Sequence, residues 1–411
     1  MLNPADDRTA RAPRPFVLAP FRALRFDPAT AGDLGTVVSP PYDVLDADLV
    51  RELEAANRHN VVRLILSRRS SRPYEAVRDR LARWRAEGAL RTDPEPGLYV
   101  YTYTVGAATV RGVLGAVAIR DPEERVVLPH EDVMAEPVRD RVALMRATRA
   151  NLEPILLIHP GMAGLAERLD AITATEPEVG FTALDGTRHR LWTVPVEHEH
   201  PICEGLGAGQ ALIADGHHRY AAYRRLQGEL RAADAADGAS PWDYGLALVV
   251  GSGDDELRIG PIHRSVGALT LSDVHELSVQ RGDRFTAMPD RESAVAHAAR
   301  PEPDVAGFVV SDGRRWAVLE TEATRPIDTA VLHETLFPAW RVEEGQVGYH
   351  HSLDQALHGL ERHPGVLVAV RPPTLAQVMS AAARGIRMPR KSTSFGPKPA
   401  MGMVLRDLDE R

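Results

Sequence analysis

The chain has 411 residues, a formal net charge of −8 at pH 7, 44% hydrophobic residues and 26% charged residues. These values indicate a globular protein of two or three units and argue against general nucleic-acid binding, which needs an excess of basic residues. Apolar runs stay well short of the roughly 18 residues of a membrane span, and the single Cys203 excludes both an intrachain disulfide framework and a multi-cysteine zinc site.

The N-terminal residues contain acidic side chains and no apolar core, so we expect a flexible arm over 1–15 rather than a signal peptide. Together with the lone cysteine, this favours a cytoplasmic protein without a membrane partner. An N-terminal α/β portion is predicted over 16–125. In it a strand ends in a Pro-Pro turn, and Tyr42 and Asp43, directly after the turn, are candidate substrate ligands.

Strand and helix patterns alternate through the rest of this portion. Val61 to Leu66 is a short apolar run and predicts a buried strand. Tyr74 to Trp84 carries large apolar residues at helical spacing and predicts a helix that packs on the core. Tyr99 to Thr104 and Val110 to Ile119, separated by a glycine-containing turn, predict an antiparallel hairpin.

A central domain is predicted over 126–265, and it begins with a cluster of polar residues. His130 and Glu131 lie in a loop before a helix, which makes them candidates for a catalytic base or a metal ligand. An ordinary surface pair is the alternative interpretation. Further residues of this cluster are candidate substrate ligands: Asp140, Arg141 and Asn151.

The strongest signal is the segment from Gln210 to Arg225. A short apolar run predicts a buried strand, an alanine-rich stretch after it predicts a helix, and a glycine turn joins the two. Such a turn directs the first N–H groups of the helix at one spot, where the helix dipole adds positive charge. We therefore expect an anion site, above all for a phosphate.

Five consecutive residues form this turn. His217, His218 and Arg219 add basic side chains to the N–H groups of the helix, and Gly216 supplies the bend, so these four are expected to bind phosphate. Asp215 is expected to cap the helix or to present a carboxylate to a metal ion or a substrate hydroxyl. A capped helix with exposed basic residues is the alternative interpretation.

A second His-Arg pair follows the next predicted strand. His263 and Arg264 repeat the arrangement of the glycine turn and are candidate substrate ligands. Taken alone, the pair is more typical of a surface turn.

A C-terminal α/β portion is predicted over 266–411, and it ends in a proline-rich loop. Only two of the 49 basic residues of the chain are lysines, and both lie in this loop. A lysine retained where arginine serves everywhere else suggests a site that needs a compact ammonium group. The loop residues expected to bind phosphate are Lys391, Ser392, Thr393 and Lys398. We expect the loop to return to the His217–Arg219 turn, although a solvated linker is the alternative.

Four of these segments together resemble one bacterial family, domain of unknown function 1015. They are the Ser-Pro-Pro-Tyr-Asp-Val segment at 39–44, the polar cluster from His130 to Arg141, the glycine turn at 213–220, and the Met-Pro-Arg-Lys-Ser-Thr-Ser-Phe segment at 388–395. The resemblance extends from about Phe16 to Asp407. It implies no activity, because the family name carries none.

The Asp-Gly-His-His-Arg sequence is also similar to the phosphate loop of the ParB and sulfiredoxin superfamily, which includes CTP-binding partition proteins and archaeal free serine kinases. This resemblance implies a mixed α/β fold in which the turn holds nucleotide phosphates and Asp215 lies near a metal ion or the acceptor hydroxyl. The implied ligands are Mg²⁺ with ATP or ADP and a small-molecule substrate, and a homodimer is a further expectation.

Three functions remain open from the sequence. The first is a phosphotransferase acting on a small hydroxylated metabolite such as free serine, with Asp215 or Glu131 orienting the hydroxyl. The second is a non-catalytic nucleotide-binding switch. The third is a metal-dependent hydrolase that uses His130, Glu131, Asp215 and His217, although no helical His or Glu spacing supports a shared ion.

Overall fold

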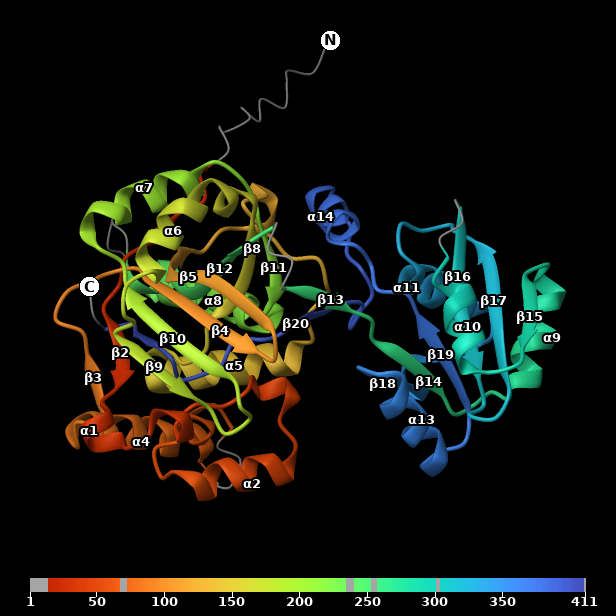
Figure 1. Cartoon of the computed structure of the whole chain (residues 1–411), viewed down its shortest axis with the longest axis horizontal. Coiled ribbons are helices and arrows are strands. Elements are labelled where there is room, and N and C mark those ends of the chain that lie inside the picture. Colours follow the sequence, from red (N-terminus) through yellow and green to blue (C-terminus); the bar gives the residue numbers. More distant parts are fainter. Residues whose placement is uncertain (1–13, 67–71, 234–239, 253–256, 301–303, 410–411) are drawn as a thin grey trace, which may run out of the picture. The chain divides into compact units, whose positions relative to one another are not determined.

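The chain folds into two compact units (Figure 1). The structure is a computed structural model that describes five stretches of the chain: 14–66, 72–233, 240–252, 257–300 and 304–409. Unit 1 contains residues 1–128, 135–254 and 399–411, and unit 2 contains residues 129–134 and 255–398. Both units combine helices with sheets, so the predicted mixed α/β class is confirmed. Most of the predicted arm at 1–15 lies outside the described residues.

Unit 1 is built around a nine-stranded sheet. Its strands are β1 (Leu18–Ala19), β4 (Tyr99–Val105), β5 (Ala108–Ala118), β6 (Val127–Leu128), β8 (Ile155–His159), β9 (Val179–Thr182), β10 (Arg188–Thr193), β11 (Ala211–Asp215) and β12 (Tyr244–Gly251). The order is β6-β11-β8-β12-β5-β4-β10-β9, with β1 beside β5. Two of the pairs are parallel, β6 with β11 and β8 with β12, and the others are antiparallel. The predicted N-terminal and central portions thus share one sheet.

A second, four-stranded antiparallel sheet in unit 1 joins the two ends of the chain. Its order is β3 (Leu90–Thr92), β2 (Ala23–Phe26), β21 (Leu405–Asp407) and β7 (Ala150–Asn151). The C-terminal strand β21 lies between β2 and β7. The last strand of the chain begins at Leu405, and Met401 before it forms only an isolated bridge to Ser39.

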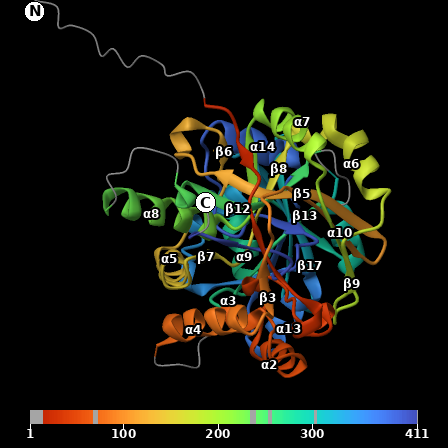
Figure 2. The same ribbon diagram turned by 90° about the vertical axis from the view of Figure 1, so that its left-hand side faces the viewer.

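Helices complete unit 1. They are α1 (Pro28–Ala31), α2 (Ala47–Ala56), α3 (Val62–Ile65), α4 (Pro73–Ala86), α5 (Ala135–Thr148), α6 (Ala166–Thr173), α7 (Val196–Gly207) and α8 (His217–Ala233), with 3₁₀ turns η1 (Leu34–Thr36), η2 (Tyr42–Val44), η3 (Pro122–Glu124), η4 (Pro160–Leu165) and η5 (Pro241–Asp243). Helices α5 and α8 lie side by side (Figure 2). On the central strand β5, both Val113 and Leu114 are at most 1% exposed, so residues on both faces of the sheet are buried.

The local predictions in unit 1 hold for most elements and fail for two. The hairpin of β4 and β5 and the helix over Tyr74 to Trp84 are confirmed. The strand predicted before the Pro-Pro turn is wrong, because η1 (Leu34–Thr36) occupies this segment and only Ser39 forms an isolated bridge, to Met401. The strand predicted over Val61 to Leu66 is wrong, because this run forms the short helix α3. The Asn60 side chain causes the change, since its amide donates to the carbonyls of Thr36 and Val38 while its oxygen accepts from the N–H of Val62.

Unit 2 is built around a six-stranded antiparallel sheet of order β15-β17-β16-β19-β14-β18. The strands are β14 (His263–Val266), β15 (Arg284–Met288), β16 (Val305–Ser311), β17 (Trp316–Glu322), β18 (Val347–His350) and β19 (Val366–Val370), and a separate pair is β13 (Arg258–Gly260) with β20 (Ser394–Gly396). The helices are α9 (Leu271–Arg281), α10 (Arg291–Ala298), α11 (Asp328–Val331), α12 (Phe337–Ala339), α13 (Leu353–Arg362) and α14 (Leu375–Ala383), with a π turn η6 (Leu332–Leu336) and a 3₁₀ turn η7 (Glu344–Gln346). Adjacent residues of β16, Phe308 and Val309, pack in two different clusters, so this sheet also buries both faces.

None of the helices in the described part of the chain combines the length and the apolar character that crossing a membrane requires.

The burial of His159 in unit 1 allows a prediction of how the free energy of unfolding changes at acidic pH. His159 at the end of β8 is fully buried, and burial lowers its pKa from 6.5 to about 4. Because the unfolded chain binds this proton more readily, the contribution of His159 is complete above its unfolded pKa and is lost as the pH falls from about 6.5 to about 4. We expect His159→Asn to reduce the slope of the unfolding free energy against pH in this window by up to about 1.4 kcal/mol per pH unit.

Denaturant titrations at several pH values measure this slope. His200→Asn is the matched control, because the His200 side chain is 87% exposed, and it should leave the slope unchanged. An equal slope in wild type and His159→Asn would contradict the prediction.

Candidate functional site

The predicted glycine turn exists in unit 1 and joins β11 to α8. Gly216 adopts φ +93°, a left-handed conformation that favours glycine. A Cβ atom there would lie 2.9 Å from Cγ2 of Ile155 and 3.0 Å from Nε of Arg219. Both the backbone and the surrounding space therefore require glycine, and the chain turns sharply into the helix. His217 and His218 are the first two residues of α8 and are half-buried.

Arg219 lies beneath the turn rather than on its surface. Its side chain is 4% exposed, forms an ion pair with Asp215 and donates to the carbonyl oxygen of Pro154. Burial by itself would lower the pKa of Arg219, but the carboxylates of Asp215 and Glu153 outweigh burial and raise it. The guanidinium thus stays charged. The sequence predicted that it faces an anion, and the structure instead balances it with Asp215.

A second buried ion pair lies next to the first. Arg141 is 7% exposed and donates from Nη1 to Oε2 of Glu153 at 3.0 Å and from Nη2 to the carbonyl oxygen of Ile65 at 3.1 Å. It also donates to Oδ2 of Asp140 at 2.6 Å. The ring of Tyr42 lies 4.6 Å from the guanidinium carbon of Arg141. Three predicted substrate ligands, Tyr42, Asp140 and Arg141, therefore meet in one cluster.

Tyr42 and Glu153 connect this cluster to the turn, because both act electrostatically on Arg219. Glu153 was missed by sequence reasoning, and only its place before a proline at the start of a buried strand hinted at a role. One of its oxygens, Oε1, is buried and has no hydrogen-bond partner among the described residues. The region beneath the turn thus contains two guanidinium groups, of Arg141 and Arg219, and three carboxylates, of Asp140, Glu153 and Asp215.

Two other predicted substrate ligands have different positions. Asn151 is 2% exposed, and its Oδ1 accepts from the backbone N–H of Leu246 and from Nη1 of Arg406, each at 3.2 Å. It therefore holds strands together. The side chain of Asp43 lies outside the described residues.

In unit 2, Glu131 holds the predicted Lys-Ser-Thr loop. Its Oε1 accepts from the backbone N–H groups of Ser392 and Thr393 and from the hydroxyl of Thr393, all at 3.0 Å, and its Oε2 accepts from the N–H of Lys391 at 3.2 Å. Burial raises the pKa of Glu131, and these hydrogen bonds oppose that shift. Glu131 was predicted as a catalytic base. In the structure its carboxylate anchors this loop through these hydrogen bonds.

His130 supports the same loop from below. It is fully buried, its Nε2 lies 2.9 Å from the hydroxyl of Thr393, and its ring contacts Phe395. Ser392 is buried as well, and its hydroxyl donates to the carbonyl oxygen of Pro389. The predicted catalytic pair of His130 and Glu131 is therefore part of the scaffold of the loop.

Lys391 is exposed and Lys398 is half-buried. Lys391 has φ +56°, and its Nζ lies 5.4 Å from the ring centre of Tyr349. Arg264, on β14, is fully buried and donates to the carbonyl oxygen of Lys391 at 3.0 Å. Burial lowers the pKa of Arg264 to about 10. The ammonium group of Lys391 thus lies near Tyr349, while the buried guanidinium of Arg264 holds the backbone of Lys391.

The second His-Arg pair does not repeat the glycine turn. His263 and Arg264 begin strand β14 and do not precede a helix. His263 is 6% exposed, and burial lowers its pKa to about 4. The similarity between this pair and the glycine turn is therefore limited to the amino-acid sequence and does not extend to the structure. Within the described residues, no three His, Cys, Asp or Glu side chains are placed to hold a metal ion.

The family model described as Protein of unknown function (DUF1015) matches residues 18–342. The chain belongs to this family. The match includes the glycine turn, Tyr42, Arg141 and Glu153, and it ends before the Lys-Ser-Thr loop. No curated protein matches the sequence.

Several solved structures resemble this DUF1015 member at low identity. A mutant free serine kinase in complex with AMP is 14% identical with a TM-score of 0.40, over 72% of this chain and 91% of that chain. A conserved hypothetical protein from Pyrococcus furiosus is 15% identical with a TM-score of 0.38, over 73% and 97%. SbnI with a C-terminal truncation, from Staphylococcus aureus, is 11% identical with a TM-score of 0.38, over 71% and 87%. At these values the likeness assigns neither a substrate nor a site to this chain.

The buried ion pair under the turn predicts a large loss of stability when it is broken. Arg219→Met leaves the Asp215 carboxylate buried without its partner, so we expect unit 1 to lose about 3–5 kcal/mol. The matched control is Arg225→Met on the same helix, which breaks an exposed pair with Glu229 of the same spacing and should cost at most about 1 kcal/mol. Urea unfolding measures both, and a loss below that of the control would contradict the prediction.

The anchoring of the Lys-Ser-Thr loop gives another prediction. In Glu131→Gln a neutral amide replaces the carboxylate, and hydrogen bonds to a charged acceptor contribute about 1.5–3 kcal/mol each. We expect the amides of Ser392 and Thr393 to exchange hydrogen at least about tenfold faster. Hydrogen exchange read by mass spectrometry checks this, with the exposed neighbour substitution Asp132→Asn as control. Unchanged exchange in Glu131→Gln would show that another contact holds the loop.

Proposed function

We propose that this protein is a phosphotransferase that moves a phosphoryl group from a nucleotide to a small hydroxylated metabolite such as free serine. The observation that supports the proposal is the turn at Gly216. A buried strand, a glycine at positive φ and a 17-residue helix bring the first helical N–H groups and two histidines to one point. Helix N-termini of this kind bind phosphate through backbone N–H groups and the helix dipole.

The charges beneath the turn support a phosphate site of defined shape. Arg219 and Arg141 are fixed by carboxylates and backbone carbonyls, so neither has to rearrange when a ligand binds. A preorganised site of this kind favours transition-state binding, because the groups are already oriented. In the proposal, His217 and His218 contact the phosphates, and Gly216 permits their close approach.

The structure also bears on the carboxylate that orients the acceptor hydroxyl. Glu131 already accepts four hydrogen bonds from its loop, which leaves Asp215 as the better-supported candidate. Asp215 forms an ion pair with Arg219, which holds its carboxylate at the turn. A nucleotide-bound Mg²⁺ needs only one or two protein carboxylates in addition to the phosphates, and Asp215 would supply one. The Mg²⁺ would neutralise charge on the transferred group.

The Lys-Ser-Thr loop enters the proposal as a second group of phosphate ligands. Lys391 and Lys398 would add ammonium charge, while Ser392 and Thr393 keep the loop in shape through Glu131 and Pro389. The return of this loop to the His217–Arg219 turn stays a prediction. Nucleotide affinity tests it, because a loop that reaches the phosphates must contribute to their binding.

Separate substitutions His218→Ala and Lys391→Ala test the phosphate site. Each should weaken ADP binding at least about tenfold, which corresponds to about 1.4 kcal/mol for one lost contact with a charged phosphate. Calorimetry measures the affinity, and His200→Ala on the exposed side of α7 is the control. Unchanged affinity in both variants would remove the phosphate site from the account.

Transfer activity requires a separate measurement. Labelled ATP and serine, followed by separation of phosphoserine, should show turnover in the wild type and a loss of about 10²-fold or more in Asp215→Asn. Nucleotide binding without transfer to serine or related hydroxyl compounds, combined with CTP-dependent dimerisation on a sizing column, would favour the nucleotide-binding switch instead.

A further inference from the structure

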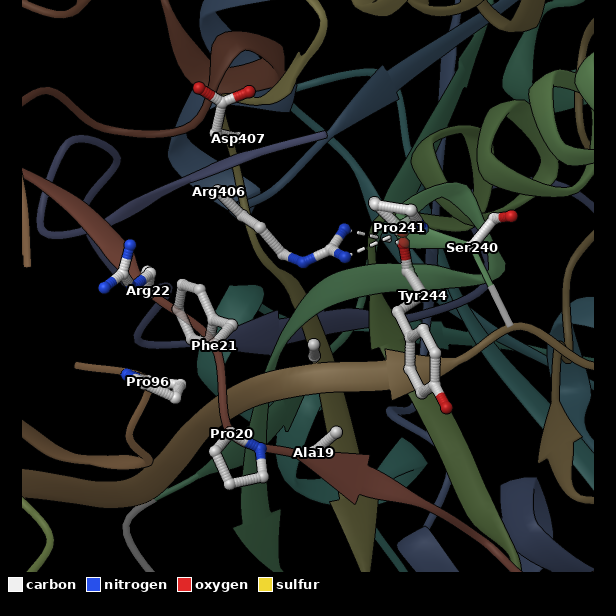
Figure 3. A pocket seen from close by; sticks show the side chains of 11 residues that line it. Ala19, Pro20, Phe21, Arg22, Pro96, Ser240, Pro241, Tyr244, Arg406 and Asp407 are labelled. Carbon is white, nitrogen blue, oxygen red and sulfur yellow. Dashed lines mark hydrogen bonds between the residues drawn. The ribbon is translucent and has the colours of Figure 1, made fainter. Parts of the chain in front are cut away.

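Unit 1 contains a pocket of about 410 Å³ that involves none of the residues of the glycine turn. Its size is within the range of about 300–1,000 Å³ typical of small-molecule sites. Segments far apart in the sequence form its walls (Figure 3). Pro20, Phe21 and Pro96 lie on one side, and Pro241 and Tyr244 lie on the other. The walls are thus rings and prolines, which present flat apolar faces.

A buried arginine from the C-terminal strand lies between these walls. Arg406 is 6% exposed, and its guanidinium donates to three neutral oxygens. Nη1 donates to Oδ1 of Asn151 at 3.2 Å and to the carbonyl oxygen of Tyr244 at 2.9 Å, and Nη2 donates to the carbonyl oxygen of Pro241 at 2.7 Å. These bonds account for three of the five N–H groups of an arginine. The two that remain, on Nε and Nη2, form the edge that carboxylates bind in bidentate fashion.

The charge of Arg406 is balanced only in part, because the carboxylate of Asp407, which also lines the pocket, acts on it electrostatically without contacting it as an ion pair. No carboxylate of the described residues forms an ion pair with it. Its chain neighbour Asp407 is 5% exposed and is paired with Arg85 instead. Burial lowers the pKa of Arg406 to about 10, so it remains protonated at neutral pH. Arg22 at the exposed rim adds a second positive charge to the pocket.

We propose that this pocket binds a small aromatic carboxylate, with its carboxylate on the Nε and Nη2 edge of Arg406 and its ring between Phe21 and Tyr244. A buried guanidinium without a carboxylate is costly, and an anionic ligand offsets that cost. The apolar walls select a flat hydrophobic body, and the single buried charge selects one anionic group. This site is independent of the proposed phosphotransferase activity.

Arg406 also has a structural role, since it ties β21 to the start of β12 and to η5. A test must therefore separate ligand binding from folding. Ala19 lines the pocket and is partly exposed, so Ala19→Phe fills the space without removing a contact of the core. Arg406→Gln removes the charge but keeps a donor for one carbonyl oxygen. Arg22→Gln at the rim is the matched arginine control.

The probes are 4-fluorophenylacetate and its neutral isostere 4-fluorophenylacetamide, titrated with the full chain and followed by fluorine NMR. We expect the carboxylate to bind at least about tenfold more tightly than the amide, because only the carboxylate pairs with Arg406. Ala19→Phe should abolish binding, and Arg406→Gln should remove the difference between the two probes. Arg22→Gln should change the affinity less than about threefold, since exposed charges contribute little.

Equal affinity of the two probes for the wild type would overturn the proposal, and so would a lack of binding by both. Carboxylate binding that survives Ala19→Phe would place the probe elsewhere and overturn it as well. If Arg406→Gln fails to fold, the comparison of the two probes in the wild type and in Ala19→Phe still shows whether the pocket binds the carboxylate.

Discussion

The ion pair between Arg219 and Asp215 is the constraint on which the glycine turn depends. A guanidinium that is 4% exposed needs a carboxylate, and the carboxylate nearest in sequence lies four residues earlier, across the turn. To bring the two together the chain has to reverse between β11 and α8, and the space left at Gly216 admits no side chain. The neighbouring pair of Arg141 and Glu153 stiffens the same region. The charges under the turn thus fix the direction in which the helix N-terminus points.

This arrangement changes which groups are expected to meet a ligand. The sequence suggested that all three basic residues of the turn grip an anion. In the structure Arg219 is paired with Asp215 beneath the turn, whereas His217 and His218 are half-buried at the first two positions of α8. The Lys-Ser-Thr loop of unit 2 is also shaped by a buried charged group, but there the charge is negative. The carboxylate of Glu131 accepts hydrogen bonds from backbone N–H groups and so determines the conformation of a basic loop. In both cases a buried charge defines a backbone conformation.

Features determined by neighbours in sequence could be predicted, and features determined by distant contacts could not. The glycine turn, the β4–β5 hairpin and the helix α4 follow from local patterns and are present. Residues Val61 to Leu66 form a helix because Asn60 bonds to carbonyls more than twenty residues earlier, which no local pattern reveals. Likewise Glu131 looked like a base because its partners lie some 260 residues later in the chain. The role of Glu153 depends on two arginines on different helices, so its place before a proline at the start of a buried strand is only a weak hint of that role.

We propose that the turn at Gly216 binds the phosphates of a nucleotide through its backbone. The most direct measurement is an NMR titration of the nitrogen-15-labelled protein with ADP that follows the amides of Gly216, His217 and His218. The account predicts that these amides shift together and saturate with one dissociation constant. Amides of the turn that stay unchanged at saturating ADP, while others shift or none do, would contradict it.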